Sequence, residues 1–181
     1  MTHPRFFGYG SLVNLNTHSY PQVETATLNG WRRVWKLHHD TDLAFLSVEP
    51  HDTLLHGITA DVPNADWEAL DAREHAYLRR DVTEQFASDT AVYEANPAHT
   101  SATNNGHHIL LSYLDVVIGG YQTLMGDNGP AHFFETTTGW APVLDDRAAP
   151  QYPRAQPLTD QIRETVDNAL TSLGITPDQI E

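Results

Sequence analysis

The sequence predicts an α+β domain built around a curled, mostly antiparallel sheet. Short apolar runs separated by turn-forming residues fill the first half of the chain, which is typical of strands joined by tight turns. A helical period appears after Pro63 and returns twice in the second half. Strands that come first, with helices inserted and appended, argue against a regular βαβ repeat. The chain has 181 residues, so we expect a single domain over residues 1–181.

Two strong turn signals organise the predicted strands. Asn29-Gly30 is typical of a two-residue hairpin turn, so the segment around it is expected to form two short strands. His51-Asp52 is expected to form the next turn, between two further strands. Strands are therefore predicted over residues 5–9, 23–39 (as two strands), 42–50, 54–62, 77–86 and 90–96, with a loop over 97–106.

Apolar residues at helical spacing predict three helices. The first follows Pro63, where Asn64 can cap it, and the last ends at Gly174. The predicted helices are residues 65–78, 108–125 and 159–174. Their expected inward residues are Leu110, Tyr113, Val117, Tyr121 and Leu124 on the second helix, and Ile162, Val166, Ala169 and Leu173 on the third.

A proline-rich stretch over residues 139–157 separates the last two predicted helices. Its prolines predict a loop without regular structure. Two charged groups in it, Asp145-Asp146-Arg147 and Tyr152-Pro153-Arg154, are interpreted as ion pairs that pin the loop. Because long irregular loops often cover sites, a role as a lid is also open.

The charge balance excludes nucleic acid as a partner. The chain has 24 Asp and Glu against 10 Lys and Arg, a net charge of −14, and Lys36 is its single lysine. Such a surface repels a phosphate backbone. If a bound small molecule is itself an anion, arginines must be placed locally to meet it. The cations available in the N-terminal half are Arg5, Arg32, Arg33, Arg79 and Arg80.

Several other classes are also excluded by composition. The sequence has no run of 18 apolar residues, so we expect no membrane span. We expect no signal peptide either, and interpret the chain as cytoplasmic. The absence of cysteine excludes disulfides, thiolate metal sites and a cysteine nucleophile. The pairs His38-His39 and His107-His108 lack the spacing of a zinc-binding helix, so we expect no metal site.

The strand "RFFGY" ends in an unusual turn, Gly8-Tyr9-Gly10-Ser11. It lacks the third glycine of a dinucleotide fingerprint, the Gly-Lys of a phosphate-binding loop and the glycine after serine of a nucleophile elbow. Two glycines leave successive backbone N–H groups unobstructed, and Ser11 adds a hydroxyl, so the turn can bind an anion such as a carboxylate. The alternative is a tight packed turn with Tyr9 in the core.

Glu74 is the second candidate. Trp67, Leu70, Glu74 and Tyr77 follow helical spacing on one stripe, and the apolar members indicate that this stripe is buried. Burial raises the pKa of a glutamate, which suits a general base working near neutral pH. Two alternatives are open: a structural glutamate paired with Arg79 or Arg80, or a helix that ends before the stripe reaches Glu74.

These motifs together resemble those of the γ-glutamylcyclotransferase-like family. Its members open with a Tyr-Gly-Ser loop at a strand end, matched here by "FFGYGSL". They carry a helix-borne glutamate, matched in "LDAREHAYLRRDV" by Leu70, Asp71, Glu74, Tyr77 and Arg79. A third segment, "SYLDVVIGGYQTLMG", resembles a family helix that opens with a substrate-contacting tyrosine, here Tyr113. The resemblance covers residues 5 to about 126.

The resemblance implies a small barrel-like sheet with flanking helices and a cavity for a γ-glutamyl group. The loop from Gly8 through Leu12 would bind the substrate's α-carboxylate, while Tyr9, Tyr77 and Tyr113 would shape the pocket. Glu74 would move the proton as the α-amine attacks the γ-carbonyl, closing 5-oxoproline and releasing the attached amine or amino acid.

The resemblance implies no cofactor and no metal, and names a small γ-glutamyl compound as the partner. Arg73, Glu74 and Tyr77 are most similar to the glutathione-specific branch, whereas His75 stands where many members have glycine. The oligomeric state is not specified by the sequence. The alternative function is a γ-glutamyl- or carboxylate-binding regulatory module that keeps the fold without turnover.

Overall fold

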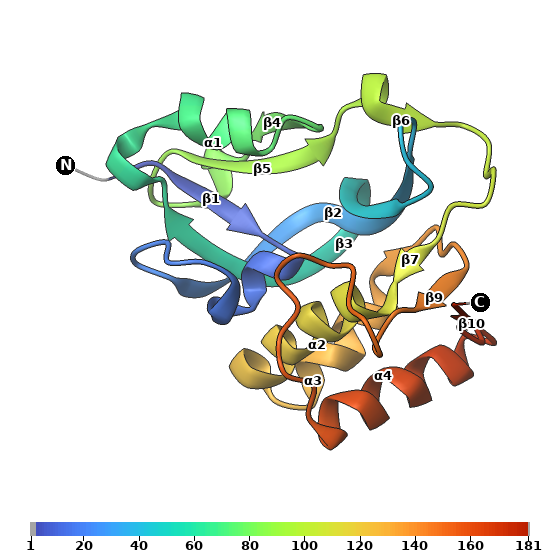
Figure 1. Cartoon of the computed structure of the whole chain (residues 1–181). Helices are drawn as coiled ribbons and strands as arrows, with labels where there is room; N and C mark the ends of the chain where they lie inside the picture. The colour runs from blue at the N-terminus through green and yellow to red at the C-terminus, as the bar shows by residue number, and fades with distance from the viewer. Residues whose placement is uncertain (1–2, 181) are drawn as a thin grey trace.

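A large sheet forms the centre of the computed structural model, which describes residues 3–180 (Figure 1). Its strand order is β4-β5-β1-β3-β2-β6, and β8 also pairs with β2. The strands are β1 (Arg5–Gly8), β2 (Glu24–His38), β3 (Ala44–Asp61), β4 (Tyr77–Asp81), β5 (Thr90–Ala95), β6 (Thr100–Ser101) and β8 (Thr137–Thr138). The pairs β1–β5 and β2–β8 are parallel, and the other pairs are antiparallel.

This arrangement confirms the predicted α+β class with a mostly antiparallel sheet. The barrel-like closure is wrong, because β4 and β6 lie at opposite ends of the strand order and do not pair with each other within residues 3–180. The sheet therefore stays open, and its two edges remain separate.

The central hairpin of β2 and β3 differs from the prediction. Each is one continuous strand, of 15 and 18 residues, so the turns expected at Asn29-Gly30 and His51-Asp52 are wrong. Their register shifts between Asn29 and Trp31, where β3 carries extra residues and the ladder contains a bulge. Gly30 has a φ of 81° there, which favours glycine. Residues that resemble two turns thus form one irregularity in a long ribbon.

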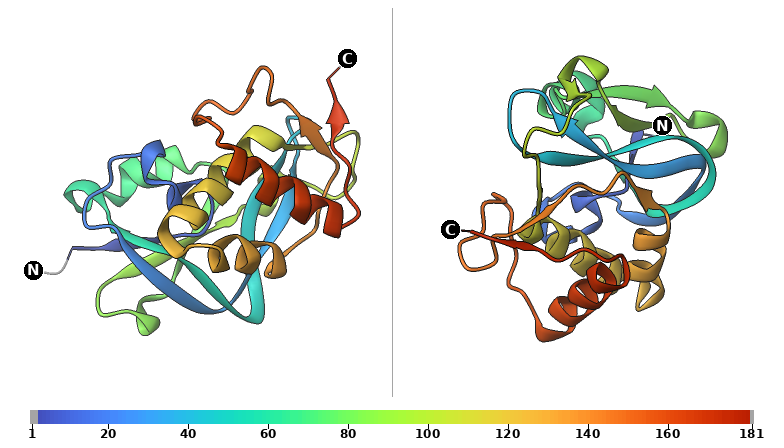
Figure 2. Two further views of the ribbon diagram at one scale, coloured as in Figure 1. Left: turned by 90° about the horizontal axis from the view of Figure 1, so that it is seen from below. Right: turned by 90° about the vertical axis from the view of Figure 1, so that its right-hand side faces the viewer.

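The helices lie in two groups (Figures 1 and 2). Three of them lie together on one side of the sheet, where α2 packs against α3 and α4. The fourth, α1, lies beside β4 and β5, away from the others. Their bounds are α1 (Trp67–Arg73), α2 (Leu111–Met125), α3 (Asn128–Glu135) and α4 (Asp160–Ser172). None of the helices within residues 3–180 has the length and apolar character needed to cross a membrane.

Helix α1 is shorter than predicted at both ends. The Asp66 side chain caps it by accepting a hydrogen bond from the Ala69 N–H at 3.0 Å, so the predicted cap at Asn64 is wrong. Asn64 instead lies in the 3₁₀ turn η3 (Pro63–Ala65) with a φ of 55°. The helix ends at Arg73, which leaves Glu74 as its C-terminal cap residue.

The later helices match their predicted stripes in part. Val117 and Tyr121 on α2 and Val166 on α4 are fully buried, as expected. On α4, however, Leu170 is buried whereas Leu173, which was predicted to point inward, is 44% exposed. The helix ends at Ser172, so Leu173 follows its last turn and leaves the inward face.

Residues 139–157 contain regular structure, contrary to prediction. Strand β9 (Val143–Asp145) pairs in parallel with β7 (Ile109–Leu110) and β10 (Asp178–Gln179) to form a small second sheet. The remainder crosses α2 toward the segment that follows β1 (Figure 1). Its prolines prevent a helix but leave these three residues free to pair.

Asp146 fixes this loop to the start of α2. Its fully buried carboxylate accepts hydrogen bonds from the Ser112 N–H at 2.7 Å and the Ser112 hydroxyl at 2.5 Å. The Gln151 N–H donates a third at 2.8 Å. Because Ser112 lies in the first turn of α2, the carboxylate also meets the positive end of the helix dipole.

Arg147 adds a second attachment. Its guanidinium contacts the Asp115 carboxylate through two nitrogens, at 2.7 and 2.8 Å, and Asp167 on α4 at 2.7 Å. Of the predicted ion pairs, those of Arg147 are confirmed, whereas Asp146 holds the loop through hydrogen bonds from uncharged donors. Residues 152–154 are consequently held over the rest of the fold.

We expect Asp146→Ala to lower the free energy of unfolding by about 2–4 kcal/mol, because it leaves buried donors of Ser112 and Gln151 without partners. Chemical denaturation measures the loss. Asp145→Ala is the matched control, since Asp145 is only half-buried and accepts longer bonds, from the Arg147 N–H at 3.2 Å and from the Gln179 side chain at 3.4 Å. An equal loss in both variants would contradict this account.

Candidate active site

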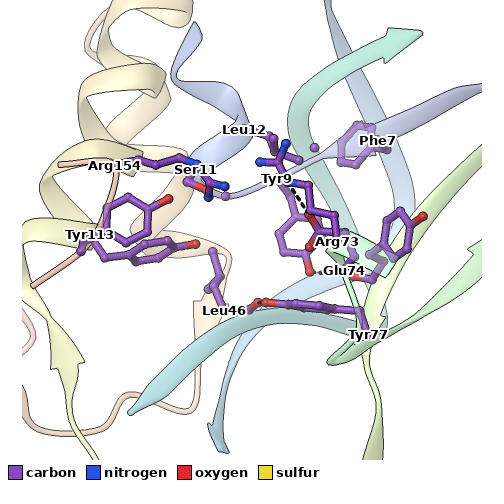
Figure 3. A pocket seen from close by; sticks show the side chains of 14 residues that line it. Phe7, Tyr9, Ser11, Leu12, Leu46, Arg73, Glu74, Tyr77, Tyr113 and Arg154 are labelled. Atoms are coloured by element: carbon purple, nitrogen blue, oxygen red, sulfur yellow. Dashed lines mark hydrogen bonds and ion pairs between the residues drawn. The ribbon is translucent and has the colours of Figure 1, made fainter. Parts of the chain in front are cut away.

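A cavity of about 200 Å³ lies between the loop after β1 and the end of α1 (Figure 3). All the site residues predicted from the sequence line it, although they come from distant parts of the chain. These residues are Gly8, Tyr9, Gly10, Ser11, Leu12, Glu74, Tyr77 and Tyr113. The sequence motifs therefore converge on one enclosed space.

The loop wall is a strand end that turns directly into the 3₁₀ helix η1 (Ser11–Val13). The first hydrogen bond of this turn runs from the Val13 N–H to the Gly10 carbonyl at 3.0 Å. The N–H groups of Ser11 and Leu12 therefore precede the turn's own hydrogen bonds. Together with the Ser11 hydroxyl they can serve an anion in the cavity.

Arg33 on β2 fixes the orientation of this loop from behind. Its Nε donates to the Tyr9 carbonyl at 2.9 Å, and the Tyr121 hydroxyl donates to the same oxygen at 3.0 Å. In a planar trans peptide the N–H points away from the carbonyl of the same unit. The Gly10 N–H is thereby directed away from Arg33, toward the side on which Gly10 lines the cavity.

The Arg33 guanidinium is fully buried, and within residues 3–180 it forms no ion pair with a carboxylate. Its other nitrogens donate to the His56 carbonyl at 2.5 Å, the Thr136 hydroxyl at 2.7 Å and the Tyr121 hydroxyl. Its charge also lies 5.0 Å from the ring of Tyr121. The loop thus has an uncompensated positive charge directly behind it.

Glu74 faces the loop from the opposite wall (Figure 3). The alternative that the helix ends before Glu74 is partly right, since α1 ends at Arg73. The Glu74 side chain nevertheless lines the cavity and is 22% exposed. The alternative that Glu74 pairs with Arg79 or Arg80 is wrong, because Arg79 pairs with Asp71 at 3.3 Å and Arg80 pairs with Glu94. Glu74 instead lies 3.5 Å from the Nε of its neighbour Arg73.

Burial is the main influence on the Glu74 carboxyl. Loss of water around the charged form raises its pKa above the ordinary value, and the nearby Arg73 and Arg154 guanidinium groups oppose that rise only in part. A carboxyl with a raised pKa can accept and return a proton closer to neutral pH. This arrangement is typical of a general base.

The tyrosines of the cavity act as walls and donors. The Tyr9 hydroxyl donates to the Tyr93 carbonyl at 2.6 Å, and the Tyr77 hydroxyl donates to the Leu46 carbonyl at 2.9 Å. Tyr113 packs edge-on against Tyr152 with ring centroids 5.0 Å apart. Burial raises the pKa of Tyr9, Tyr77 and Tyr113, so they stay protonated and leave Glu74 as the proton acceptor.

Two residues of the proline-rich loop complete the cavity, and sequence analysis missed them. Tyr152 and Arg154 line it, although that segment was interpreted as pinning the loop. Within residues 3–180, Arg154 forms no ion pair, so its charge is available to a ligand. No periodicity or motif links residue 154 to residue 11, and the one signal in the sequence was the long proline-rich loop itself, for which a role as a lid was an open alternative. The cations expected from sequence, Arg5 and Arg32, pair with acids elsewhere.

The donors best placed to hold a metal ion lie outside the cavity. His38, His39 and Asp40, in the turn between β2 and β3, place their donor atoms within 4.8 Å of one another. His39 and Asp40 are exposed, and none of the three lines the cavity that contains Glu74. The expectation of no metal at the site stays a prediction.

We expect Arg33→Lys to destabilise the fold by about 2–4 kcal/mol, because an ammonium cannot reproduce the planar fork that joins Tyr9, His56 and Thr136. Arg32→Lys is the matched control, since Arg32 is only half-buried and pairs with Glu49. It should change stability by less than about 0.5 kcal/mol. Denaturant unfolding of both variants checks the difference, and equal stabilities would show that the fork is dispensable.

Comparisons with known proteins were made by sequence and by structure. No protein-family model matches the chain, and no curated protein matches it. The structure is similar to a solved gamma-glutamyl cyclotransferase, with a TM-score of 0.55 and 11% identity, over 92% of this chain and 99% of that one. It is also similar to YkqA from Bacillus subtilis, with a TM-score of 0.54 and 14% identity. That match covers 77% of this chain but 57% of the other. The chain therefore has the fold of γ-glutamyl cyclotransferase-like structures.

Proposed function

We propose that the chain is a γ-glutamylcyclotransferase-type enzyme, which converts a γ-glutamyl group to 5-oxoproline and releases the attached amine or amino acid. One observation carries this proposal: a desolvated glutamate faces an anion-binding loop across a single cavity. A binding module needs the loop, but only a catalyst makes use of a buried base opposite it. The fold shared with a gamma-glutamyl cyclotransferase supports the same conclusion.

Binding begins with the α-carboxylate of the substrate. The N–H groups of Ser11 and Leu12 and the Ser11 hydroxyl would donate hydrogen bonds to it. The Arg154 guanidinium would contact it from the proline-rich loop. Arg33 contributes at longer range, since its buried charge acts through the Tyr9 peptide. In a chain of net charge −14, this local group of cations explains how an anionic substrate is held.

Chemistry then requires a free amine. An α-ammonium group has a pKa of about 8 and cannot attack while it is protonated. Glu74 takes its proton, the amine nitrogen attacks the γ-carbonyl carbon, and the bond from that carbon to the leaving nitrogen breaks. Glu74 returns this proton to the leaving nitrogen, and the ring nitrogen then gives up its second proton to Glu74, which releases it to solvent. The products are the lactam, the neutral amine and one proton, so atoms and charge balance, and we expect no metal or cofactor to take part.

Ring closure is intramolecular, so the protein has only to hold one molecule in the reactive conformation. Holding the amine near the γ-carbonyl replaces a bimolecular encounter, and well-oriented reactions of this kind gain several orders of magnitude in rate. The walls formed by Tyr9, Tyr77 and Tyr113 would keep the substrate folded. No covalent nucleophile is required.

We expect Glu74→Gln to lower kcat for 5-oxoproline formation by about 10²–10⁴-fold, because glutamine keeps the shape but cannot exchange the proton. Glu68→Gln on the exposed face of α1 is the matched control and should retain full activity. Turnover of Glu74→Gln within a few-fold of the original chain would exclude this mechanism. If the original chain binds γ-glutamyl compounds without releasing 5-oxoproline, the binding-module function replaces the enzyme.

The raised pKa of Glu74 also predicts how stability depends on pH. The unfolded chain loses this proton first as pH rises, so ionisation of Glu74 costs stability above its ordinary range near 4.5. Compared with the original chain, Glu74→Gln should therefore be relatively more stable at pH 7 than at pH 4. Denaturant unfolding at both pH values measures the difference. A lower relative stability at pH 7 would mean that attraction to Arg73 and Arg154 outweighs desolvation.

We expect Gly10→Ala to raise KM by roughly tenfold while the protein stays folded. A Cβ at this position would lie 2.9 Å from the Tyr113 hydroxyl and 3.3 Å from a Leu46 methyl group, so the tyrosine must move into the cavity. The φ of Gly10 is −123°, so crowding rather than backbone strain is the cause. Tyr113→Phe in the same chain removes the crowded oxygen and should recover part of the affinity. No recovery would place the defect elsewhere in the loop.

A further inference from the structure

A second cavity, of about 180 Å³, adjoins the first. The two share Leu46, Tyr77, Tyr113 and Tyr152 as common walls. Beyond these walls the second cavity is bounded by Leu43, by Ala44 and Phe45 at the start of β3, and by Leu110 at the end of β7. The two cavities therefore lie next to each other, on either side of these four shared side chains.

The second cavity is apolar, in contrast to the first. Its lining side chains are aliphatic or aromatic, and among the described residues that form it none carries a charge. Phe45 packs edge-on against Tyr77 with centroids 5.5 Å apart. The Tyr77 hydroxyl is already bonded to the Leu46 carbonyl, so its ring rather than its polar group faces a ligand. The cations Arg73 and Arg154 line the first cavity only.

The two cavities define a direction for the substrate. In Figure 3, Ser11 and Arg154 lie on one side of the first cavity, and Leu46 and Tyr77 lie on the other. A γ-glutamyl group whose α-carboxylate contacts Ser11 and Arg154 extends its γ-amide past Glu74 toward the shared walls. The substituent on that amide then reaches the second cavity.

We propose that the second cavity binds the leaving group, and that the substrates are γ-glutamyl amides of uncharged, apolar amines. This inference rests on the function proposed above and narrows it. The sequence resemblance leaned toward glutathione, whose leaving group ends in a carboxylate. A carboxylate in the second cavity would lose its water and find no cation, which is costly, whereas an alkyl or aryl group gains from burial. The leaving amine also departs in its neutral form, as an apolar site requires.

Binding of molecules that cannot cyclise tests the subsite apart from catalysis. Glutaric acid monobenzylamide and the glutaric monoamide of glycine share the carboxylate and the amide but lack the α-amine. Calorimetric titration of the unmodified protein should give at least roughly tenfold tighter binding of the benzylamide, since even one methylene in an apolar pocket is worth about that much. Equal affinities, tighter binding of the glycine amide, or no binding of either would overturn the inference.

A charge placed in the second cavity should invert this preference. Leu43 is half-buried at its rim, so Leu43→Arg introduces a cation that can meet the carboxylate of the glycine amide. The benzylamide preference should fall by about tenfold or more. Leu54→Arg is the matched control, because Leu54 lies on β3, is 41% exposed and lines neither cavity. An unchanged preference in Leu43→Arg would overturn the assignment.

Turnover separates the two proposals. The protein should release 5-oxoproline from γ-glutamylbenzylamide with at least roughly tenfold higher kcat/KM than from glutathione or γ-glutamylglycine. Preferred turnover of glutathione would overturn the apolar subsite and leave the proposed function intact. Absence of 5-oxoproline from every compound, with the binding preference retained, would overturn the function and leave the subsite in place.

Discussion

The buried guanidinium of Arg33 is the contact on which the loop, the sheet and the helices jointly depend. It extends from β2 and joins the Tyr9 carbonyl, the His56 carbonyl of β3, the Tyr121 hydroxyl of α2 and the Thr136 hydroxyl beyond α3. A buried charge without a carboxylate is expensive, and here several acceptors and the rings of Tyr121 and Phe133 offset that cost.

The charge of Arg33 also affects the pKa of a nearby histidine. The pKa of His132 falls to about 4, chiefly through burial and then through the nearby His56 and Arg33. Neutral imidazole at this position avoids a second cation in the core. On the far side of the Tyr9 peptide the same field favours an anion. The interaction that holds the loop in place therefore also puts a positive charge behind it.

The sequence predicted the parts of the site that local chemistry controls. Two glycines before Ser11 leave the N–H groups of the turn unobstructed by neighbouring side chains, and Glu74 directly follows the last turn of α1, so sequence spacing was enough to place it on the inward side. The sequence could not predict the positions of Arg33 and Arg154, because these depend on tertiary contacts. Arginines in a strongly acidic chain are expected to form surface ion pairs, and only the fold shows that Arg33 is buried and that Arg154 lines the cavity with the loop after β1.

The errors in the fold have a similar origin. Asn29-Gly30 and His51-Asp52 are genuine turn formers, but the pairing partners on either side of them decided the outcome. The ladder between β2 and β3 continues on both sides of these segments, which therefore form a bulge and not two turns. The open sheet follows from the same limit, since closure depends on whether β4 and β6 meet, and neither strand's residues encode that distance.

The position of Tyr152 and Arg154 late in the chain has a consequence for when the cavity is completed. The walls of the cavity come from residues 7–12, 46, 73–77, 93, 113 and 152–154. During synthesis the anion-binding loop leaves the ribosome early, yet its last cation follows about 140 residues later. Contacts so far apart in sequence form slowly. A nascent chain therefore carries an incomplete cavity until residues 152–154 have been made.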